Sequence, residues 1–411
     1  TKCQFWIQIM RVIFQTIIIF FVISSCEKYP SVDTVWPPYE NSTAAPIITS
    51  VSPHADSAFG GFTILTISGE NFSSDSGGNF IYIGGEKVPP ASESANEIVV
   101  QAPSVFGDTI SIRIVVPQAE KLASYDYRLQ TLSEEYGGFT NLDKVRCIAM
   151  DSGGNLYSMM GDRTVRKTDP NGEYTEFGTT TFPQASEMRF GPNNTLFLIK
   201  VSNRVLYTIG EEGGEVQEYA TFPDYVDDER VKLTSFDFDI NNNIFLAGSG
   251  GGAFVVRADT SVNSLGIYVD FKITSVRVFD GYVYFAGTQV IYRNKIIDDN
   301  GTLETEELVI DLAETEEFSS HDIKSITFSS DGKMIIGTDP NDGDADPILV
   351  MKTNGQLEAL YSDQLMAPAY HVLWGNGSYI YVNRYHSDAQ KRRIIKVNML
   401  GGGAPYYGRQ Q

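Results

Sequence analysis

The chain has 411 residues, of which 42% are hydrophobic and 12% aromatic, so it is long enough to bury two hydrophobic cores. Asp and Glu total 52 against 31 Lys and Arg, which gives a formal net charge of −21. This acidity, without a basic stripe, argues against binding to nucleic acid or to an anionic membrane surface. Phe, Tyr and Gly are abundant, as is typical of short strands and tight turns.

The N-terminus has the pattern of a secretory signal. Lys2 and Arg11 precede an apolar run over residues 12–22, and small residues follow before Cys26. A transmembrane anchor is the alternative, but the run is short for a membrane span. The tetrapeptide Ile-Ser-Ser-Cys that ends at Cys26 resembles the bacterial lipobox, whose cysteine receives lipid. The resemblance implies a lipoprotein signal peptide over residues 1–25 and lipidation at Cys26.

The segment after Cys26 is polar and rich in proline. It shows no hydrophobic periodicity, so residues 26–45 are expected to form an extended tether. Cys3 would leave with the signal peptide and Cys26 would be acylated. Cys147 then remains alone, so it cannot form an internal disulfide, and its apolar neighbours predict a buried, unreactive thiol.

Residues 46–129 are expected to form a small all-β unit. Short alternating apolar runs, separated by Gly, Ser and Asn turns, lie at 63–67, 80–83, 97–100 and 109–115. The ordered motifs Pro46-Ile-Ile, Gly60-Gly-Phe-Thr, Ile67-Ser-Gly-Glu-Asn-Phe, Ile81-Tyr-Ile-Gly-Gly and Tyr125-Asp-Tyr resemble the IPT/TIG immunoglobulin-like module. The resemblance implies a sandwich that serves as a spacer or an interaction domain.

The rest of the chain repeats a strand-turn-strand pattern six times, at intervals of about 40–50 residues. Each copy has an apolar triplet, a turn rich in Gly, Asn and Asp, and a second apolar strand. The triplets begin at Ile148, Met188, Phe236, Val276, Ile326 and Val372. Two further strands fit in each copy, for example 164–168 and 174–177 in the first and 393–397 and 405–407 in the last.

Four antiparallel strands per copy and six copies predict a six-bladed β-propeller over residues 139–411, which resembles NHL-type repeats. The predicted fold class is therefore all-β, a sandwich followed by a propeller. A β-solenoid is the alternative, although its repeats would be shorter and more uniform.

Loops on one face of the predicted propeller bring together residues suited to ligand binding. The candidates, which lie in loops of the fifth and sixth copies, are His321, Tyr370, His371, Arg384, Tyr385, His386 and Asp388. Tyr rings can stack on sugars, while Arg and carboxylates can read hydroxyl groups. An ordinary solvated polar face explains the same residues without a ligand.

A metal site is the third interpretation of this face. Asp342, Asp344 and Asp346 alternate along one loop, and carboxylate oxygens suit calcium. The run lacks the glycine and the late Glu of an EF-hand loop. We therefore predict no cofactor, and calcium is only a weak candidate. Trp374 falls in a column that is apolar in every copy, so we expect it in the core.

No nucleophile elbow, P-loop or HExxH motif occurs, so the sequence favours a protein that is not an enzyme. The order of lipobox, IPT/TIG module and propeller resembles the surface lipoproteins of Bacteroidota. The resemblance implies a lipid-anchored outer-membrane protein that binds a glycan or polysaccharide, with a TonB-dependent transporter and its substrate-binding lipoprotein as partners. A metal-dependent lactonase or lyase and a protein–protein scaffold remain as alternatives.

Overall fold

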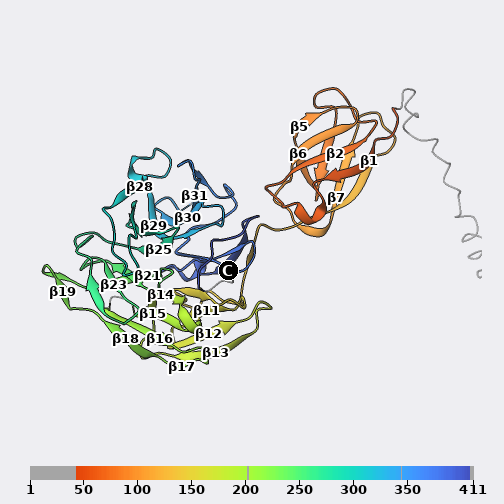
Figure 1. The fold of residues 1–411 in the computed structure, drawn as a ribbon. Coiled ribbons are helices and arrows are strands. Elements are labelled where there is room, and N and C mark those ends of the chain that lie inside the picture. Colours follow the sequence, from red (N-terminus) through yellow and green to blue (C-terminus); the bar gives the residue numbers. More distant parts are fainter. Residues whose placement is uncertain (1–42, 201–202, 344, 408–411) are drawn as a thin grey trace, which may run out of the picture. The chain divides into compact units, whose positions relative to one another are not determined.

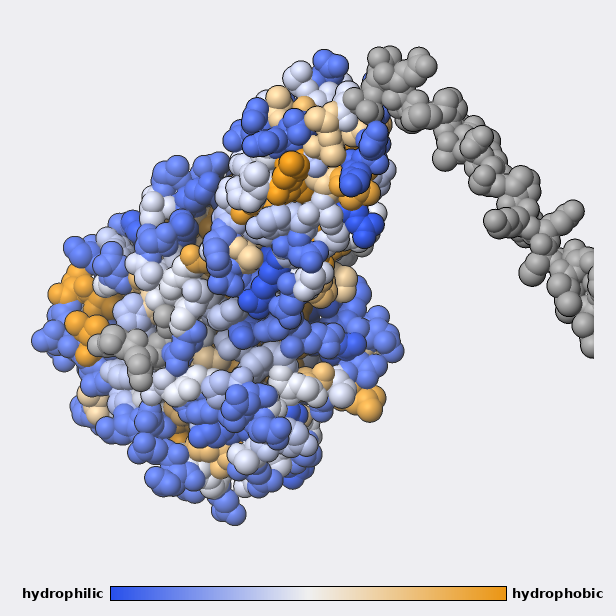
Figure 2. All heavy atoms as spheres, turned by 90° about the vertical axis from the view of Figure 1, so that its right-hand side faces the viewer, coloured by the Kyte–Doolittle hydropathy of each residue, from blue (hydrophilic) through white to orange (hydrophobic). Residues whose placement is uncertain are grey.

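The structure is a computed structural model that describes residues 43–200, 203–343 and 345–407. These residues form strands and four short 3-10 helices, and among them no helix is long and apolar enough to cross a membrane. The chain divides into two compact units between Gln130 and Thr131 (Figure 1). The predicted signal peptide, Cys26 and most of the predicted tether lie outside the described residues. The face drawn in Figure 2 is mostly hydrophilic, with its hydrophobic residues in separate patches.

The first unit packs two four-stranded antiparallel sheets around one core. Their strand orders are β1(Ile47–Ser52)–β2(Ile64–Glu70)–β6(Glu97–Gln101)–β5(Pro90–Glu93) and β4(Glu86–Val88)–β3(Phe80–Ile83)–β7(Gly107–Val115)–β8(Ala123–Leu129). Leu65 and Ile67 of β2 and Ile81 and Ile83 of β3 are fully buried, because alternate residues of a strand point to the same face. This alternation explains why the strands of this unit were predictable from the sequence.

The second unit contains six consecutive antiparallel sheets. The first three are β10(Ile148–Met150)–β11(Leu156–Met159)–β12(Thr164–Thr168)–β13(Tyr174–Thr179), β14(Ala185–Phe190)–β15(Leu196–Lys200)–β16(Val205–Ile209)–β18(Gln217–Thr221) and β21(Leu233–Phe238)–β22(Ile244–Gly248)–β23(Phe254–Val256)–β24(Val262–Ser264). The next two are β25(Ser275–Phe279)–β26(Tyr282–Ala286)–β27(Val290–Lys295)–β28(Glu307–Asp311) and β29(His321–Phe328)–β30(Met334–Pro340)–β31(Ile348–Met351)–β32(Leu357–Ala359). The last is β33(His371–Trp374)–β34(Tyr379–Asn383)–β35(Ile394–Asn398)–β9(Ser133–Glu135).

A short strand β17(Gly214–Glu215) adds to the first sheet beside β13, and β19(Tyr225–Val226) pairs with β20(Glu229–Arg230) in a separate ribbon. All six predicted triplets fall in the first strands of their sheets. The prediction of an all-β fold is confirmed.

The six sheets stay separate and are arranged in a propeller-like way (Figure 1). The first strand of each sheet contacts the first strand of the next, and β33 contacts β10. A buried apolar cluster fills each space between consecutive sheets. A sixth cluster, which includes Met150 and Leu373, lies between the last sheet and the first. Trp374 is 1% exposed, so its predicted place in the core is confirmed.

The last sheet differs from the prediction in its outer strand. Residues 405–407 were expected to supply it, but they form no strand. Instead β9 pairs with β35, Glu134 opposite Lys396, so the sheet joins both ends of this unit. The repeat region therefore begins before residue 139, the predicted boundary. A strand of three polar residues carries no periodic signal of its own, and its partner lies at the far end of the chain.

Candidate functional site

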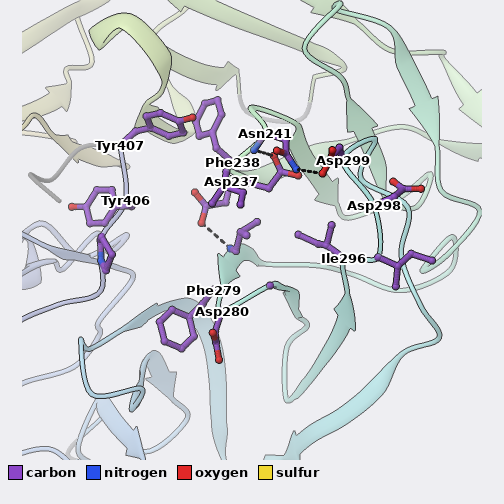
Figure 3. Close-up of a pocket in the computed structure, with 16 residues that line it drawn as sticks. Asp237, Phe238, Asn241, Phe279, Asp280, Ile296, Asp298, Asp299, Tyr406 and Tyr407 are labelled. Carbon is purple, nitrogen blue, oxygen red and sulfur yellow. Dashed lines mark hydrogen bonds between the residues drawn. The ribbon is translucent and has the colours of Figure 1, made fainter.

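A cavity of about 780 Å³ lies at the end of the second unit where the first strands finish (Figure 3). Its walls come from the turns after β21 and β25, from the loop after β27 and from residues 405–407. The volume is in the range of pockets that hold small molecules. The cavity lies among residues that the sequence analysis did not select.

Four aromatic rings line this cavity, two from the sheets and two from the C-terminal segment. Phe279 stacks on Phe328 with ring centroids 4.3 Å apart, and Phe238 meets Tyr407 edge-on at 5.4 Å. The Tyr407 hydroxyl donates to Asn242 and the Tyr406 hydroxyl donates to the backbone carbonyl of Trp374. These contacts hold flat apolar faces in fixed positions, which is how proteins present stacking surfaces to a ring-shaped ligand.

The remaining lining is rich in carboxylates and contains no Lys, Arg or His among the described residues. Asp239 organises the turn after β21, since its Oδ1 accepts the backbone N–H groups of Asn241 at 2.9 Å and Asn243 at 2.8 Å. Burial raises the pKa of Asp239 despite these hydrogen bonds. The Asn241 amide donates to Asp299 at 3.3 Å (Figure 3). Such a lining accepts hydrogen bonds from hydroxyl or amino groups and disfavours anions.

Asp237 connects the cavity to the interior of the unit. Its Oδ2 accepts the backbone N–H of Val278 at 2.8 Å, and the guanidinium groups of Arg189 and Arg277 lie 3.9 Å and 3.6 Å away. Burial raises the pKa of Asp237 to about 6, against the opposing effect of Arg189. Two Arg residues therefore share one buried carboxylate.

A second buried carboxylate, Glu187, continues the network away from the cavity. Its oxygens meet Arg189 at 3.2 Å, His371 Nε2 at 2.8 Å and the Ser235 hydroxyl at 2.9 Å. Burial alone would raise the pKa of Glu187, but Arg189, His371 and Ser235 outweigh it and the pKa is lowered. Charged groups thus form a continuous chain from the cavity to His371.

These groups occupy two equivalent rows of the repeats. The middle residues of the six triplets form one row, which contains Arg189, Asp237, Arg277 and Thr327. The residues two places earlier form the other row, Cys147, Glu187, Ser235, Ser275, Ser325 and His371. Of these two rows, the sequence analysis selected only His371 as a site candidate and missed Glu187, although a two-residue spacing on a strand places both rows on one face.

Serines of the second row link neighbouring sheets. Ser235, Ser275 and Ser325 each accept the backbone N–H of the next first strand, at Val276, Ile326 and Val372. Because Ser235 meets Val276 and Asp237 meets Val278, these neighbouring first strands run in the same direction. Their starts therefore share one end of the array, and the cavity lies at the other.

Of the predicted ligand-binding residues, Tyr370 and Tyr385 come together, with ring centroids 5.1 Å apart. Both are partly buried, and Arg146, which the sequence analysis did not select, lies over both rings. His371 is buried and bonded to Glu187 rather than part of a loop surface. The loops before β33 and after β34 thus form a cluster at the end of the array opposite to the cavity.

The other predicted ligand-binding residues form hydrogen bonds within the protein. Arg384 is buried and donates to the carbonyl of Ala367 at 2.7 Å, because its backbone continues the β34–β35 ladder and turns the side chain inward. His321 is also buried, with Nε2 3.2 Å from the carbonyl oxygen of Asp346. His386 Nδ1 accepts the N–H of Asp388, whose carboxylate in turn caps the short helix η4(Ala389–Lys391).

The predicted metal candidates do not form a described site. Asp344 lies outside the described residues, Asp342 is exposed, and Asp346 accepts the N–H of Asp363 at 2.9 Å. Within the described residues, no group of three or more His, Cys, Asp or Glu is arranged to hold a metal ion. Cys147 is buried and free, as expected, and burial raises its thiol pKa.

Comparison with known proteins identifies the first unit. Residues 46–130 match the model of the IPT/TIG domain, which confirms the resemblance in that part of the chain. No curated protein matches the chain.

Solved structures share the fold over most of their length. An auxiliary nutrient binding protein from Bacteroides thetaiotaomicron aligns with a TM-score of 0.53 at 13% identity, covering 88% of this chain and 99% of that one. A protein from the same organism, described provisionally as a phosphatase, gives 0.57 at 11% identity, covering 88% and 98%. A luciferin-regenerating enzyme gives 0.50 at 12%, covering 68% and 99%. At these identities the similarity concerns the fold alone.

Proposed function

We propose that this chain is a non-catalytic glycan-binding protein of a polysaccharide-uptake system, lipid-anchored at Cys26 and exposed on the outer membrane. Its ligand occupies the cavity at the end of the second unit. The partners are a TonB-dependent transporter and the substrate-binding lipoprotein of the same system.

The lining of the cavity is the observation that carries this proposal. The rings of Phe279 and Tyr407 line the cavity together with the carboxylate of Asp280 and the amide of Asn241 (Figure 3). A sugar ring has an apolar face that stacks on aromatic side chains and hydroxyl groups that donate to carboxylates. The name of the similar Bacteroides thetaiotaomicron structure, an auxiliary nutrient binding protein, supports a nutrient as the ligand.

We also infer that the six sheets are the blades of one closed, NHL-like, six-bladed propeller. The apolar cluster between the last and first sheets and the pairing of β9 with β35 support closure, because a strand from the opposite end completes the last blade. The IPT/TIG domain then acts as a spacer between the lipid anchor and this propeller.

Replacing Phe279 by Ala tests the proposed site. The protein should bind at least one neutral polysaccharide from a panel such as xyloglucan, arabinan, galactomannan and levan in affinity gel electrophoresis. The Phe279→Ala variant should bind that polysaccharide at least about tenfold more weakly, since one aromatic stacking surface is lost. Phe62→Ala, which removes a 42% exposed ring from the IPT/TIG domain, is the matched control. Equal binding by the wild type and Phe279→Ala would contradict the proposal that the polysaccharide binds in the cavity.

The enzyme alternative has one observation in its favour. His371 and Glu187 form a buried pair at 2.8 Å, an arrangement in which a carboxylate can orient an imidazole for proton transfer. The two proposals differ in the fate of the ligand. Mass spectrometry of the bound polysaccharide after prolonged incubation should recover it intact; shortened or unsaturated products that disappear in His371→Gln would establish the lyase-like activity instead.

A further inference from the structure

A partly buried arginine without an acidic partner lies at the end of the array opposite to the cavity. Arg146 precedes β10, and its Nη1 donates to Gln184 Oε1 at 3.4 Å while its Nη2 donates to the Tyr370 hydroxyl at 3.2 Å. Within the residues that the structure describes it forms no ion pair, and its Nε is buried without a hydrogen-bond partner.

The two buried carboxylates in the first strands, Glu187 and Asp237, do not form ion pairs with Arg146. Glu187 forms ion pairs with Arg189 and His371, and Asp237 forms ion pairs with Arg189 and Arg277. Arg189, His371 and Ser235 lower the pKa of Glu187 against the effect of burial. Arg146 is therefore a surplus positive charge in a chain whose net charge is −21.

The surroundings of Arg146 hold its guanidinium in place and leave donors free. The guanidinium carbon lies 5.9 Å from the Tyr370 ring centroid and 5.5 Å from that of Tyr385. A guanidinium has five N–H donors. Gln184 takes one from Nη1, Tyr370 takes one from Nη2, and the Nε–H is buried, so one N–H on each Nη remains. The remaining donors suit a carboxylate, which Arg binds through two parallel hydrogen bonds.

We propose that Arg146, together with Tyr370, Tyr385 and Gln184, binds the carboxylate of an acidic sugar at a second site, separate from the acidic cavity. The two tyrosine rings offer the apolar surface that a sugar ring contacts, and Arg146 supplies the charge. The choice of a sugar rests on the proposed glycan-binding function; the choice of a carboxylate rests on Arg146 alone. One end of the array then selects anionic sugar units, and the cavity selects neutral ones.

Matched monosaccharides test this site. Glucuronate and galacturonate differ from glucose and galactose by a carboxylate at C6, so their relative affinities for the full chain report the charge contact. Isothermal titration or ligand-observed NMR should give at least about tenfold tighter binding of one uronate than of its neutral partner, since hydrogen bonds to charged groups are the stronger class. Arg146→Gln should abolish that preference. Arg146→Lys, which keeps the charge but loses the planar fork, should bind the uronate with intermediate affinity.

Arg113→Gln, which changes the charge by the same amount in the IPT/TIG unit, should bind like the wild type. Thermal unfolding of each variant shows whether it is folded, and Arg146→Lys provides the comparison if Arg146→Gln is not. A wild type without preference for uronates, or a preference that survives in folded Arg146→Gln, overturns the second site.

If neutral polysaccharides bind to the wild type and bind more weakly to Phe279→Ala, while uronates are not preferred over neutral sugars, only the cavity proposal stands. Uronate binding that depends on Arg146 without any neutral binding supports the second site and rejects the cavity.

Discussion

Two buried carboxylates at the centre of the second unit respond in opposite ways to the same degree of burial. The pKa of Glu187 is lowered, because Arg189, His371 and Ser235 all favour its ionised form. The pKa of Asp237 is raised to about 6, because desolvation exceeds the favourable contacts from Arg189 and two backbone N–H groups. The number and distance of donors, rather than burial, decide which carboxylate is ionised most readily.

This difference predicts a pH dependence that can be isolated with Asp237→Asn. The folded pKa of Asp237 exceeds its unfolded value of about 3.8, so the folded state binds the proton more tightly. Its stabilising contribution is thus greatest at low pH and is lost as pH rises from about 4 through about 6. The free energy of unfolding of the wild type minus that of Asp237→Asn should fall by about 3 kcal/mol across this window and then level off.

Urea unfolding at half-unit pH steps measures this difference. Subtracting the variant removes the contributions of titratable groups that do not interact with Asp237. A difference that stays level between pH 4 and 6 and falls only as the pH drops below about 4 would mean that the two Arg contacts hold the folded pKa of Asp237 below its unfolded value.

Core and surface aromatic side chains should differ sharply in their contribution to stability. Trp374 is 1% exposed and packs between the last two sheets, whereas Tyr225 is 61% exposed on a short ribbon. Trp374→Ala should reduce the free energy of unfolding by about 3–5 kcal/mol, because it leaves a large cavity. Tyr225→Ala should change it by less than about 0.5 kcal/mol. Chemical denaturation of both variants checks the ranking, and similar losses would contradict it.

At the scale of elements, the sequence predicted those strands and turns that neighbouring residues in the chain determine. Each triplet, its Gly- and Asn-rich turn and the strand that follows are adjacent in the chain, so alternation and turn residues identify them. The outer strand of the last sheet is different, because Glu134 pairs with Lys396 across nearly the whole unit. Residues 405–407 read as a strand from their aromatic content, but their rings instead form a wall of the cavity.

The role of β9 predicts a difference between two truncated chains. A chain that starts at Thr131 retains β9, whereas one that starts at Phe139 leaves β35 with an unpaired edge and removes the contact of Tyr136 with Tyr381. The shorter chain should therefore unfold at a lower temperature or aggregate, since an exposed strand edge promotes association. Differential scanning calorimetry and light scattering of the two chains make the comparison. Equal melting temperatures would show that β9 is dispensable.

At the scale of the whole molecule, the order of units was more predictable than the site. The IPT/TIG motifs and the six repeats are spread along the chain and each carries local signals. The cavity joins turns after β21 and β25 to the C-terminal segment, and nothing in the sequence of Pro405–Tyr407 shows which sheets it will reach. Tyr370 and Tyr385 were placed together correctly because neighbouring loops of one sheet share an end, but Arg146 comes from another sheet.

The proposed attachment of the whole molecule to the membrane depends on one cysteine. Cys26→Ala removes the thiol that would be acylated. Each buried CH₂ of an acyl chain contributes about 0.8 kcal/mol, so two or three chains make release from the membrane negligible. The wild-type protein should fractionate with membranes and partition into the detergent phase of Triton X-114, and Cys26→Ala should move to the aqueous phase. Cys147→Ala is the matched control, because that buried thiol lies inside the second unit and its loss should leave the anchor intact. If Cys26→Ala remains with the membrane fraction and in the detergent phase, the lipoprotein assignment is wrong and the apolar run over residues 12–22 must itself hold the protein in the membrane.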